Sequence, residues 1–201
     1  MKKVLCFGDS NTYGYIPQTG QRYSKDERWC GILQSLLGNN WEIIEQGCNN
    51  RTAIKENPMG KIYTGYKILP EYLSNDLSWI ILSIGINDLQ TQYNTKLEDL
   101  YEGIKILIDM AKIKCPNTKI LLLAPPRLND GILKGYFSTL YDQSAIEKSA
   151  KLPPIYKKIA LETGCEFINL DEIIKTSQKD GLHLESISHK IIADTIFNVI
   201  N

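Results

Sequence analysis

The chain has 201 residues, of which 43% are hydrophobic, and it carries 23 basic and 23 acidic residues. This length suits one domain, residues 1–201, and the apolar content is sufficient for a packed core. The balanced charge gives no sign of a surface for nucleic acid or membrane, so neither partner is expected.

The N-terminus and the cysteines indicate the compartment. Only four apolar residues follow Met1-Lys2-Lys3 before Gly8, too few for the apolar segment of a secretion signal, and no other run could cross a bilayer. The five cysteines are odd in number, scattered and free of any C-x-x-C spacing, which favours unpaired thiols in a reducing environment. We therefore expect a cytoplasmic protein.

Short apolar runs alternate with amphipathic stretches along the chain. Strands are predicted at residues 3–7, 41–46, 79–84, 119–123 and 166–168, and helices at residues 28–37, 66–73, 97–114, 144–163 and 186–200. Three of the strands are nearly continuous in Val, Ile and Leu, which is typical of strands covered on both faces. The alternation predicts a parallel sheet with helices on both sides.

Three local signals refine the later elements. Pro153 and Pro154 are expected to break the stretch 144–163 into two parts, and Gly164 to end the second as a C-cap. Ser186 is the candidate N-cap of the last helix. The stretch 125–140, with two prolines, two glycines and several aromatic residues, predicts a long ordered loop of the kind that more often has a function.

Four polar segments carry the chemistry: Gly8-Asp9-Ser10-Asn11-Thr12, Gln46 to Thr52, Gly85-Ile86-Asn87-Asp88 and Asp180-Gly181-Leu182-His183. The first three follow strands, where open α/β sheets bind ligands, and the fourth precedes the last helix. The spacing of Asp180 and His183 lets the carboxylate fix the imidazole tautomer while the other ring nitrogen faces a nucleophile. A serine combined with such a pair indicates nucleophilic acyl transfer.

Each segment also has a plainer interpretation. The first could be a polar turn or a phosphate cradle, and the second a turn followed by a helix N-terminus. In the third, Asn87 or Asp88 could cap a helix, and in the fourth His183 could be a lone surface histidine. Their coincidence in successive loops favours the catalytic interpretation. His189 has no partner at comparable spacing and is expected to be a packing histidine.

The pattern GDSNT, G-x-N-x-R-T, GIND and DGLHL resembles the SGNH (GDSL-type) hydrolase family in all four blocks and in their order. Within that family, the segments Arg28 to Leu33, Asn49-x-Arg51-Thr52 and Ala124-Pro125-Pro126 resemble the bacterial arylesterase, carbohydrate acetylesterase and acyltransferase branch. The resemblance implies that Ser10 is the nucleophile, that His183 is its base, and that Asp180 orients the histidine. It implies oxyanion donors at the Ser10 N–H, the Asn87 amide and the Asn50 N–H.

Asn50 departs from the family pattern, which usually has glycine at this position. Asparagine tolerates a positive φ, so its N–H can still serve as a donor. Its side chain would narrow the site, which predicts a preference for small acyl groups. Gly47 matches the earlier, turn-forming glycine of the block.

The remaining candidates have supporting or binding roles. Asp9 and Asp88 are expected to brace their own loops through backbone N–H groups, because their spacing matches no metal motif. No metal or cofactor is expected. Candidates for a substrate wall are Tyr13, Trp29, Arg51 and Tyr136, with Phe137 and Tyr141 beside them.

The sequence thus predicts a flavodoxin-like three-layer α/β/α sandwich with a five-stranded parallel sheet in the order 2-1-3-4-5. The expected activity is that of a serine esterase acting on short-chain, above all acetyl, esters of small molecules such as carbohydrates or aryl alcohols. Acyl transfer to a second alcohol and formation of a homo-oligomer are considered as well. The alternatives are a lysophospholipase or thioesterase with a long acyl groove, a non-catalytic binding module of the same fold, and a flavodoxin-type nucleotide binder.

Overall fold

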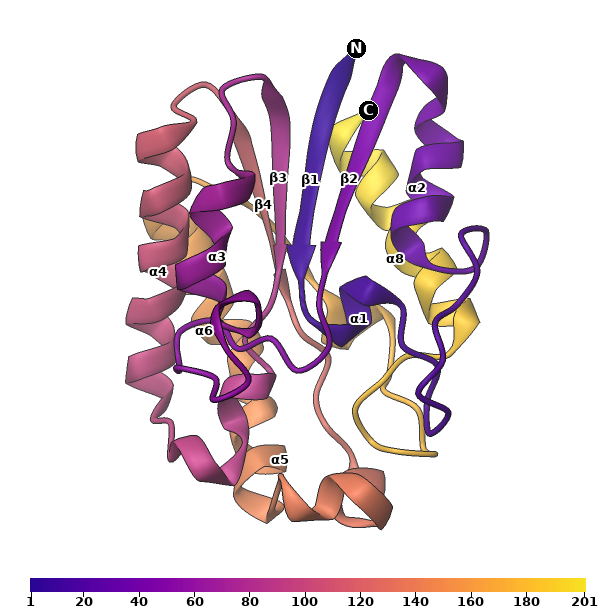
Figure 1. Ribbon diagram of the computed structural model, residues 1–201, viewed down its shortest axis with the longest axis vertical. Helices are drawn as coiled ribbons and strands as arrows, with labels where there is room; N and C mark the ends of the chain where they lie inside the picture. The colour runs from indigo at the N-terminus through magenta and orange to yellow at the C-terminus, as the bar shows by residue number, and fades with distance from the viewer.

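The computed structural model describes residues 1–201 and is built around a five-stranded parallel sheet in the order β2-β1-β3-β4-β5 (Figure 1). The strands are β1 (Lys2–Gly8), β2 (Trp41–Gly47), β3 (Leu77–Ser83), β4 (Lys119–Ala124) and β5 (Glu166–Asn169). All five predicted strands are found, and the predicted strand order is confirmed.

Eight α-helices accompany the sheet. They are α1 (Ser10–Tyr13), α2 (Trp29–Leu37), α3 (Gly65–Tyr72), α4 (Leu97–Lys114), α5 (Gln143–Ser149), α6 (Leu152–Thr163), α7 (Leu170–Ile173) and α8 (Ser186–Ile200). Short 3-10 turns are η1 (Gly38–Asn40), η2 (Lys61–Tyr63), η3 (Asn87–Leu89), η4 (Thr91–Tyr93), η5 (Asp130–Leu133) and η6 (Gly135–Thr139). Helices α2 and α8 cover one face of the sheet and α3, α4 and α6 the other, which confirms the three-layer prediction (Figure 1).

The apolar character of the strands follows from this double cover. In β1, Leu5 and Phe7 belong to the hydrophobic cluster under α3, α4 and α6, whereas Val4 and Cys6 belong to the cluster under α2 and α8. Successive side chains of a strand point to opposite faces, so a strand between two cores is apolar at nearly every position.

Two of the predicted helix boundaries are confirmed and one is wrong. Pro153 and Pro154 lie in the first turn of α6, where a missing N–H removes no helical hydrogen bond, and Gly164 ends that helix at φ 66°. Ser186, however, is the first helical residue of α8, and the N-cap is Glu185. The Glu185 carboxylate caps no N–H group of α8, and it accepts a 2.6 Å hydrogen bond from the Ser177 hydroxyl.

The register of the central strands positions the functional loops. Gly8 is paired with Gly47 on one side and with Ser83 on the other, so β1, β2 and β3 end at the same level. A Cβ atom on Gly47 would lie 2.1 Å from the Tyr13 nitrogen, so only glycine lets α1 pack against the end of β2. The loops after these three strands therefore meet at one edge of the sheet.

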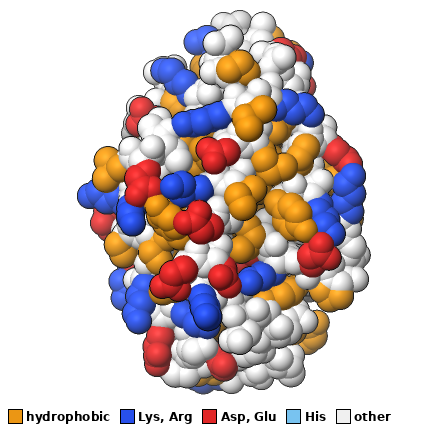
Figure 2. All heavy atoms as spheres, turned by 90° about the vertical axis from the view of Figure 1, so that its left-hand side faces the viewer, with side chains coloured by type: hydrophobic (Ala, Val, Ile, Leu, Met, Phe, Trp, Pro, Cys, Tyr) orange, Lys and Arg blue, Asp and Glu red, His pale blue; other side chains and the backbone are white.

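The surface carries mixed charge. Figure 2 views the face covered by α4, where basic and acidic side chains are interspersed with hydrophobic ones.

No helix combines the length and hydrophobicity that a bilayer crossing requires. All five cysteines are unpaired thiols; Cys6, Cys30 and Cys115 are buried, and Cys48 and Cys165 are half-buried.

Candidate active site

Three side chains from opposite ends of the chain form a hydrogen-bonded series. Oγ of Ser10 lies 3.0 Å from Nε2 of His183, and Nδ1 of that ring lies 2.9 Å from Oδ2 of Asp180. An ionised carboxylate only accepts hydrogen bonds, so Nδ1 carries the proton and Nε2 accepts from the serine hydroxyl. All three residues are at most 3% exposed.

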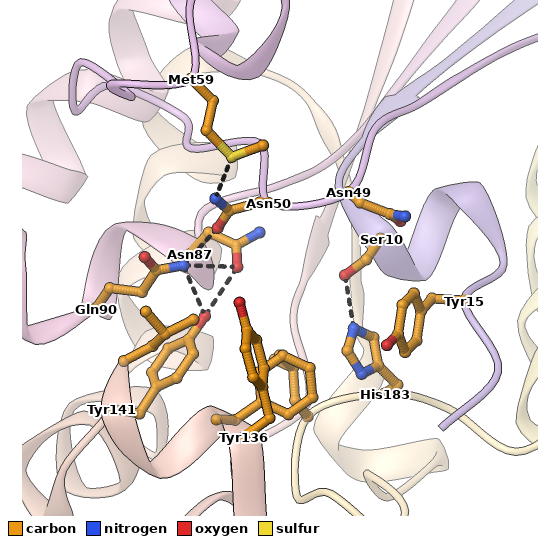
Figure 3. A pocket seen from close by; sticks show the side chains of 13 residues that line it. Ser10, Tyr15, Asn49, Asn50, Met59, Asn87, Gln90, Tyr136, Tyr141 and His183 are labelled. Atoms are coloured by element: carbon orange, nitrogen blue, oxygen red, sulfur yellow. Dashed lines mark hydrogen bonds between the residues drawn. The ribbon is translucent and has the colours of Figure 1, made fainter. Parts of the chain in front are cut away.

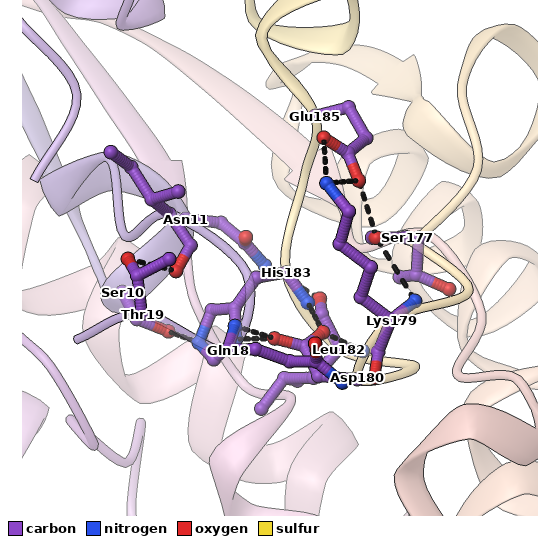
Figure 4. A network of polar contacts seen from close by, with 12 residues as sticks. Ser10, Asn11, Gln18, Thr19, Ser177, Lys179, Asp180, Leu182, His183 and Glu185 are labelled. Carbon is purple, nitrogen blue, oxygen red and sulfur yellow. Dashed lines mark hydrogen bonds and ion pairs between the residues drawn. The ribbon is translucent and has the colours of Figure 1, made fainter. Parts of the chain in front are cut away.

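The Asp180 carboxylate is held by four donors (Figure 4). Besides the His183 ring, the backbone N–H groups of Leu182 and His183 donate to Oδ1 at 3.1 and 2.9 Å, and the N–H of Gln18 donates to Oδ2 at 3.2 Å. Burial alone would raise the pKa of Asp180, but the hydrogen bonds and charge of His183 outweigh it and the pKa is lowered. Asp180 is therefore ionised at neutral pH.

Local backbone chemistry places Ser10 at the start of α1. Asp9 is the N-cap of this helix and accepts a 2.9 Å hydrogen bond from the Asn11 N–H, as predicted for a residue bracing its own loop. Burial raises the pKa of Asp9 to about 7, against the opposing effects of that N–H and of Arg51. The Asn11 side chain then donates to the Leu182 carbonyl at 3.3 Å, which ties α1 to the loop that carries His183.

Tyr15 contacts the histidine and Gln18 the carboxylate, and no sequence motif pointed to either residue. The Tyr15 ring stacks on His183 with centroids 4.1 Å apart and planes inclined by 27°. Gln18 contributes only a backbone group to Asp180, and a backbone group has no signature in the sequence. Both lie in the turn after α1 that folds over the residue 180–183 loop.

Potential oxyanion donors converge beside Ser10. Asn50 has a φ of 62°, the left-handed conformation in which asparagine is tolerated, and its backbone N–H donates no hydrogen bond within the protein. The N–H of Ser10, at the first position of α1, is likewise free. Nδ2 of Asn87 donates one hydrogen to the Arg51 carbonyl at 3.0 Å, which leaves its second hydrogen available.

Asp88 braces a different loop from the one predicted. Its carboxylate accepts from the backbone N–H groups of Ala53, Ile54 and Lys55, at 2.6, 2.9 and 3.0 Å. Burial raises the pKa of Asp88 to about 6, although these hydrogen bonds oppose the change. Asp88 thus holds residues 53–55, which directly follow the second polar segment, against the third segment, rather than bracing its own turn.

A cavity of about 210 Å³ opens over the Ser10 hydroxyl (Figure 3). Three candidates for the substrate wall line it: Tyr136, Phe137 and Tyr141, the last of which is buried. Sequence reasoning missed the other lining residues, Tyr15, Asn49, Met59, Gln90, Leu140 and Leu182. Gln90 follows Asn87 by three residues, a spacing that places both side chains on one side of a helical turn and could have indicated it.

Three residues predicted for the substrate wall do not line this cavity. Trp29 is 1% exposed in the core beneath α2 and α8, and Tyr13 packs under the guanidinium of Arg22 instead. Arg51 is also buried, and it donates to the carbonyls of Gly8, Gln46 and Ile62. Arg51 therefore joins three backbone segments behind the site, because a buried guanidinium must satisfy its donors.

His189 is a packing histidine, as predicted. It is wholly buried, its Nδ1 accepts a 3.4 Å hydrogen bond from the Trp29 N–H, and its Nε2 has no partner. Burial lowers its pKa to about 4, and the nearby His183 acts in the same direction. No group of three or more His, Cys, Asp or Glu side chains could hold a metal ion.

The parallel sheet and the arrangement of polar groups at its edge are those of an α/β hydrolytic enzyme with a serine at the site. The sequence profile of the GDSL-like lipase/acylhydrolase family matches residues 6–191. The chain belongs to this family and is a carboxylic ester hydrolase. No curated protein matches the chain.

Solved structures agree with this assignment. A carbohydrate acetylesterase from Sinorhizobium meliloti is 28% identical, with a TM-score of 0.92 over 100% of this chain and 98% of that one. An aryl esterase from M. smegmatis is 25% identical, with a TM-score of 0.90 over 100% and 98%. A lipase/acylhydrolase from Enterococcus faecalis, at 18% identity and a TM-score of 0.70 over 100% and 95%, shares the fold.

Proposed function

We propose that this protein hydrolyses short-chain esters of small alcohols, above all acetyl esters, through an acyl-enzyme formed on Ser10. The observation that carries the proposal is the series Ser10, His183 and Asp180, with distances of 3.0 and 2.9 Å in a buried site. A serine hydroxyl is a weak nucleophile until a base removes its proton during attack, and His183 is placed to do so.

Acylation begins when Oγ of Ser10 attacks the ester carbonyl carbon and its proton passes to Nε2 of His183. The ionised Asp180 stabilises the imidazolium that forms. The carbonyl oxygen becomes an oxyanion, which the N–H groups of Ser10 and Asn50 and Nδ2 of Asn87 stabilise. His183 then protonates the leaving alkoxide, the C–O bond to the alcohol breaks, and the acyl group remains on Ser10.

Deacylation repeats these steps with water. His183 removes a proton from the water as its oxygen attacks the acyl carbon, and the same donors stabilise the second oxyanion. Collapse of that intermediate returns the proton to Oγ of Ser10 and releases the carboxylic acid. A second alcohol in place of water would give acyl transfer by the same route.

The acyl preference rests on Asn50. Its side chain lines the cavity, where Oδ1 accepts a 2.6 Å hydrogen bond from Nε2 of Gln90 and Nδ2 lies 3.2 Å from Sδ of Met59. Because both the oxygen and the nitrogen of the Asn50 amide are held by contacts, this side chain cannot move aside. Little space is then left for an acyl chain beside the oxyanion position. The names of the similar structures, a carbohydrate acetylesterase and an aryl esterase, support the same substrate class.

The test is a series of p-nitrophenyl esters from acetate to decanoate, assayed with the wild type and with Ser10→Ala. We expect the highest kcat/KM on acetate and no activity above background for Ser10→Ala. A rate that rises with chain length would contradict the acetyl preference and favour a lysophospholipase or thioesterase.

Labelling with a fluorophosphonate separates catalysis from binding. The reagent should modify Ser10, detected by peptide mass spectrometry, and Ser10→Ala should stay unlabelled. A folded wild type that is neither labelled nor active on any ester would contradict the proposal and support a non-catalytic binding module.

A further inference from the structure

The amide of Asn87 has two possible orientations, and only one serves catalysis. With Nδ2 toward the substrate it donates to the oxyanion, whereas with Oδ1 there it would repel the same charge. The two amide orientations are almost identical in shape, so hydrogen-bond partners decide between them. The surroundings of Asn87 therefore matter for the proposed function, on which this inference rests.

The carbonyl oxygen of Arg51 determines which atom of the Asn87 amide faces it. A carbonyl oxygen only accepts, and Nδ2 of Asn87 lies 3.0 Å from it, so the nitrogen occupies this side. Oδ1 then faces the Tyr141 hydroxyl at 2.8 Å, and this hydroxyl must donate to it. Burial raises the pKa of Tyr141, so the hydroxyl keeps the proton that it donates.

Gln90 links Asn87 to Asn50, a second asparagine whose side chain lines the cavity. Its Nε2 lies 3.4 Å from the Tyr141 hydroxyl, 3.4 Å from Oδ1 of Asn87 and 2.6 Å from Oδ1 of Asn50 (Figure 3). Oε1 of Gln90 in turn accepts a 2.8 Å hydrogen bond from Nε2 of Gln92. The two asparagines of the site are thus joined through one buried amide.

We propose that Tyr141 and Gln90 are positioning residues that hold the Asn87 amide with Nδ2 toward the oxyanion. Tyr141 contributes most, because its 2.8 Å hydrogen bond is the short contact to Oδ1 of Asn87. Donation into Oδ1 also polarises the amide and strengthens its N–H groups as donors, since hydrogen bonds in series reinforce one another. Tyr141 directly follows residues 125–140, so this stretch brings its hydroxyl to the site in addition to the cavity-lining residues Tyr136, Phe137 and Leu140.

The direct test is Tyr141→Phe, which removes the hydroxyl and keeps the ring. We expect kcat on p-nitrophenyl acetate to fall about 10-fold with KM within twofold, less than the roughly 100- to 1,000-fold loss for a missing oxyanion donor. Binding of a boronic acid, which forms a tetrahedral adduct on Ser10, should weaken by a similar factor.

A double-mutant cycle with Asn87→Ala distinguishes positioning from a general structural role. If Tyr141 acts through Asn87, Tyr141→Phe should have little effect in the Asn87→Ala background. Equal losses in both backgrounds, or a change in KM alone, would overturn the inference. If Tyr141→Phe does not fold, Gln90→Met supplies a second cycle, because it removes the Nε2 donor to Oδ1 of Asn87 and keeps a side chain of similar size.

Tyr93 provides the matched control. Its hydroxyl is buried near the same network but has no hydrogen-bond partner, so Tyr93→Phe should leave kcat unchanged. If the wild type shows no ester hydrolysis, or if Ser10→Ala hydrolyses esters as fast as the wild type, the proposed function is contradicted. An active wild type in which Tyr141→Phe and Gln90→Met change nothing would contradict only the present inference.

Discussion

The ring of Tyr15 lies against the imidazole of His183, with centroids 4.1 Å apart and an interplanar angle of 27°. Phe137 approaches the same imidazole, with centroids 5.3 Å apart. Two aromatic rings therefore flank the proposed base, Tyr15 stacked and Phe137 tilted, while its nitrogens are hydrogen-bonded to Ser10 and Asp180. Because Tyr15 comes from the turn after α1, the segment that carries the serine also covers the histidine.

Replacing Tyr15 should reveal the contribution of this ring face. The imidazolium formed during attack lies over the ring, and a shielded cation–π contact is worth about 1–2 kcal/mol. Tyr15→Ala should lower kcat on p-nitrophenyl acetate about 10-fold. Tyr15→Phe keeps the face and should stay near the wild-type rate. Equal losses in both variants would show that the hydroxyl, and not the ring, is required.

Asp180→Asn should abolish most of the activity without unfolding the protein. The amide has nearly the same shape, but it can no longer stabilise the imidazolium and it favours the wrong tautomer of His183. A loss on the order of 10,000-fold in kcat is expected. Steady-state kinetics measures the loss and circular dichroism checks the fold. An active Asp180→Asn enzyme would contradict the role proposed for the carboxylate.

Asn50→Gly should widen the acyl specificity. Glycine adopts the φ of 62° without strain, so the backbone N–H keeps its place while the side chain is removed. The ratio of kcat/KM for hexanoate over acetate should rise about 10-fold, the equivalent of roughly 1.4 kcal/mol. Asn94→Gly, at a positive φ outside the cavity, is the control and should leave the ratio unchanged. A variant that accepts only the same short esters would argue against crowding by Asn50.

His189 should make the fold sensitive to acid. Its pKa is lowered from 6.5 to about 4 by burial, so between these values the unfolded chain binds the proton and the folded chain does not. Stability is therefore highest above pH 6.5 and falls as the pH drops toward 4, by roughly 3 kcal/mol in total.

The raised pKa values of Asp9 and Asp88 act in the opposite direction, so the contribution of His189 must be isolated by difference. His189→Asn keeps an acceptor for the Trp29 N–H but cannot titrate. Urea unfolding between pH 7 and 4 should show the wild type losing stability relative to this variant. A difference that is constant over this range would contradict the prediction.

The order of strands and helices could be predicted from the sequence because it depends on local periodicity. The alternation of Val4 and Cys6 with Leu5 and Phe7 defines a strand between two cores, and the prolines at 153 and 154 mark the start of α6. The wrong prediction of Ser186 as the N-cap also comes from relying on local sequence alone. Residue types near a helix end do not determine which residue is the first helical one, and here α8 begins at Ser186, so Glu185 is the N-cap.

The sequence by itself determined the strands, the polar loops at their ends and the local pair Asp180 and His183, because each depends on spacing along the chain. Only the tertiary structure decided that Ser10 meets His183, 173 positions further along the chain, and that Tyr141 is hydrogen-bonded to Asn87. It also decided that Trp29 and Arg51 are buried behind the site and do not line it. These contacts depend on how loops pack over the sheet edge. Packing is set by the shapes and hydrogen-bonding needs of side chains distant in sequence, which no local pattern records.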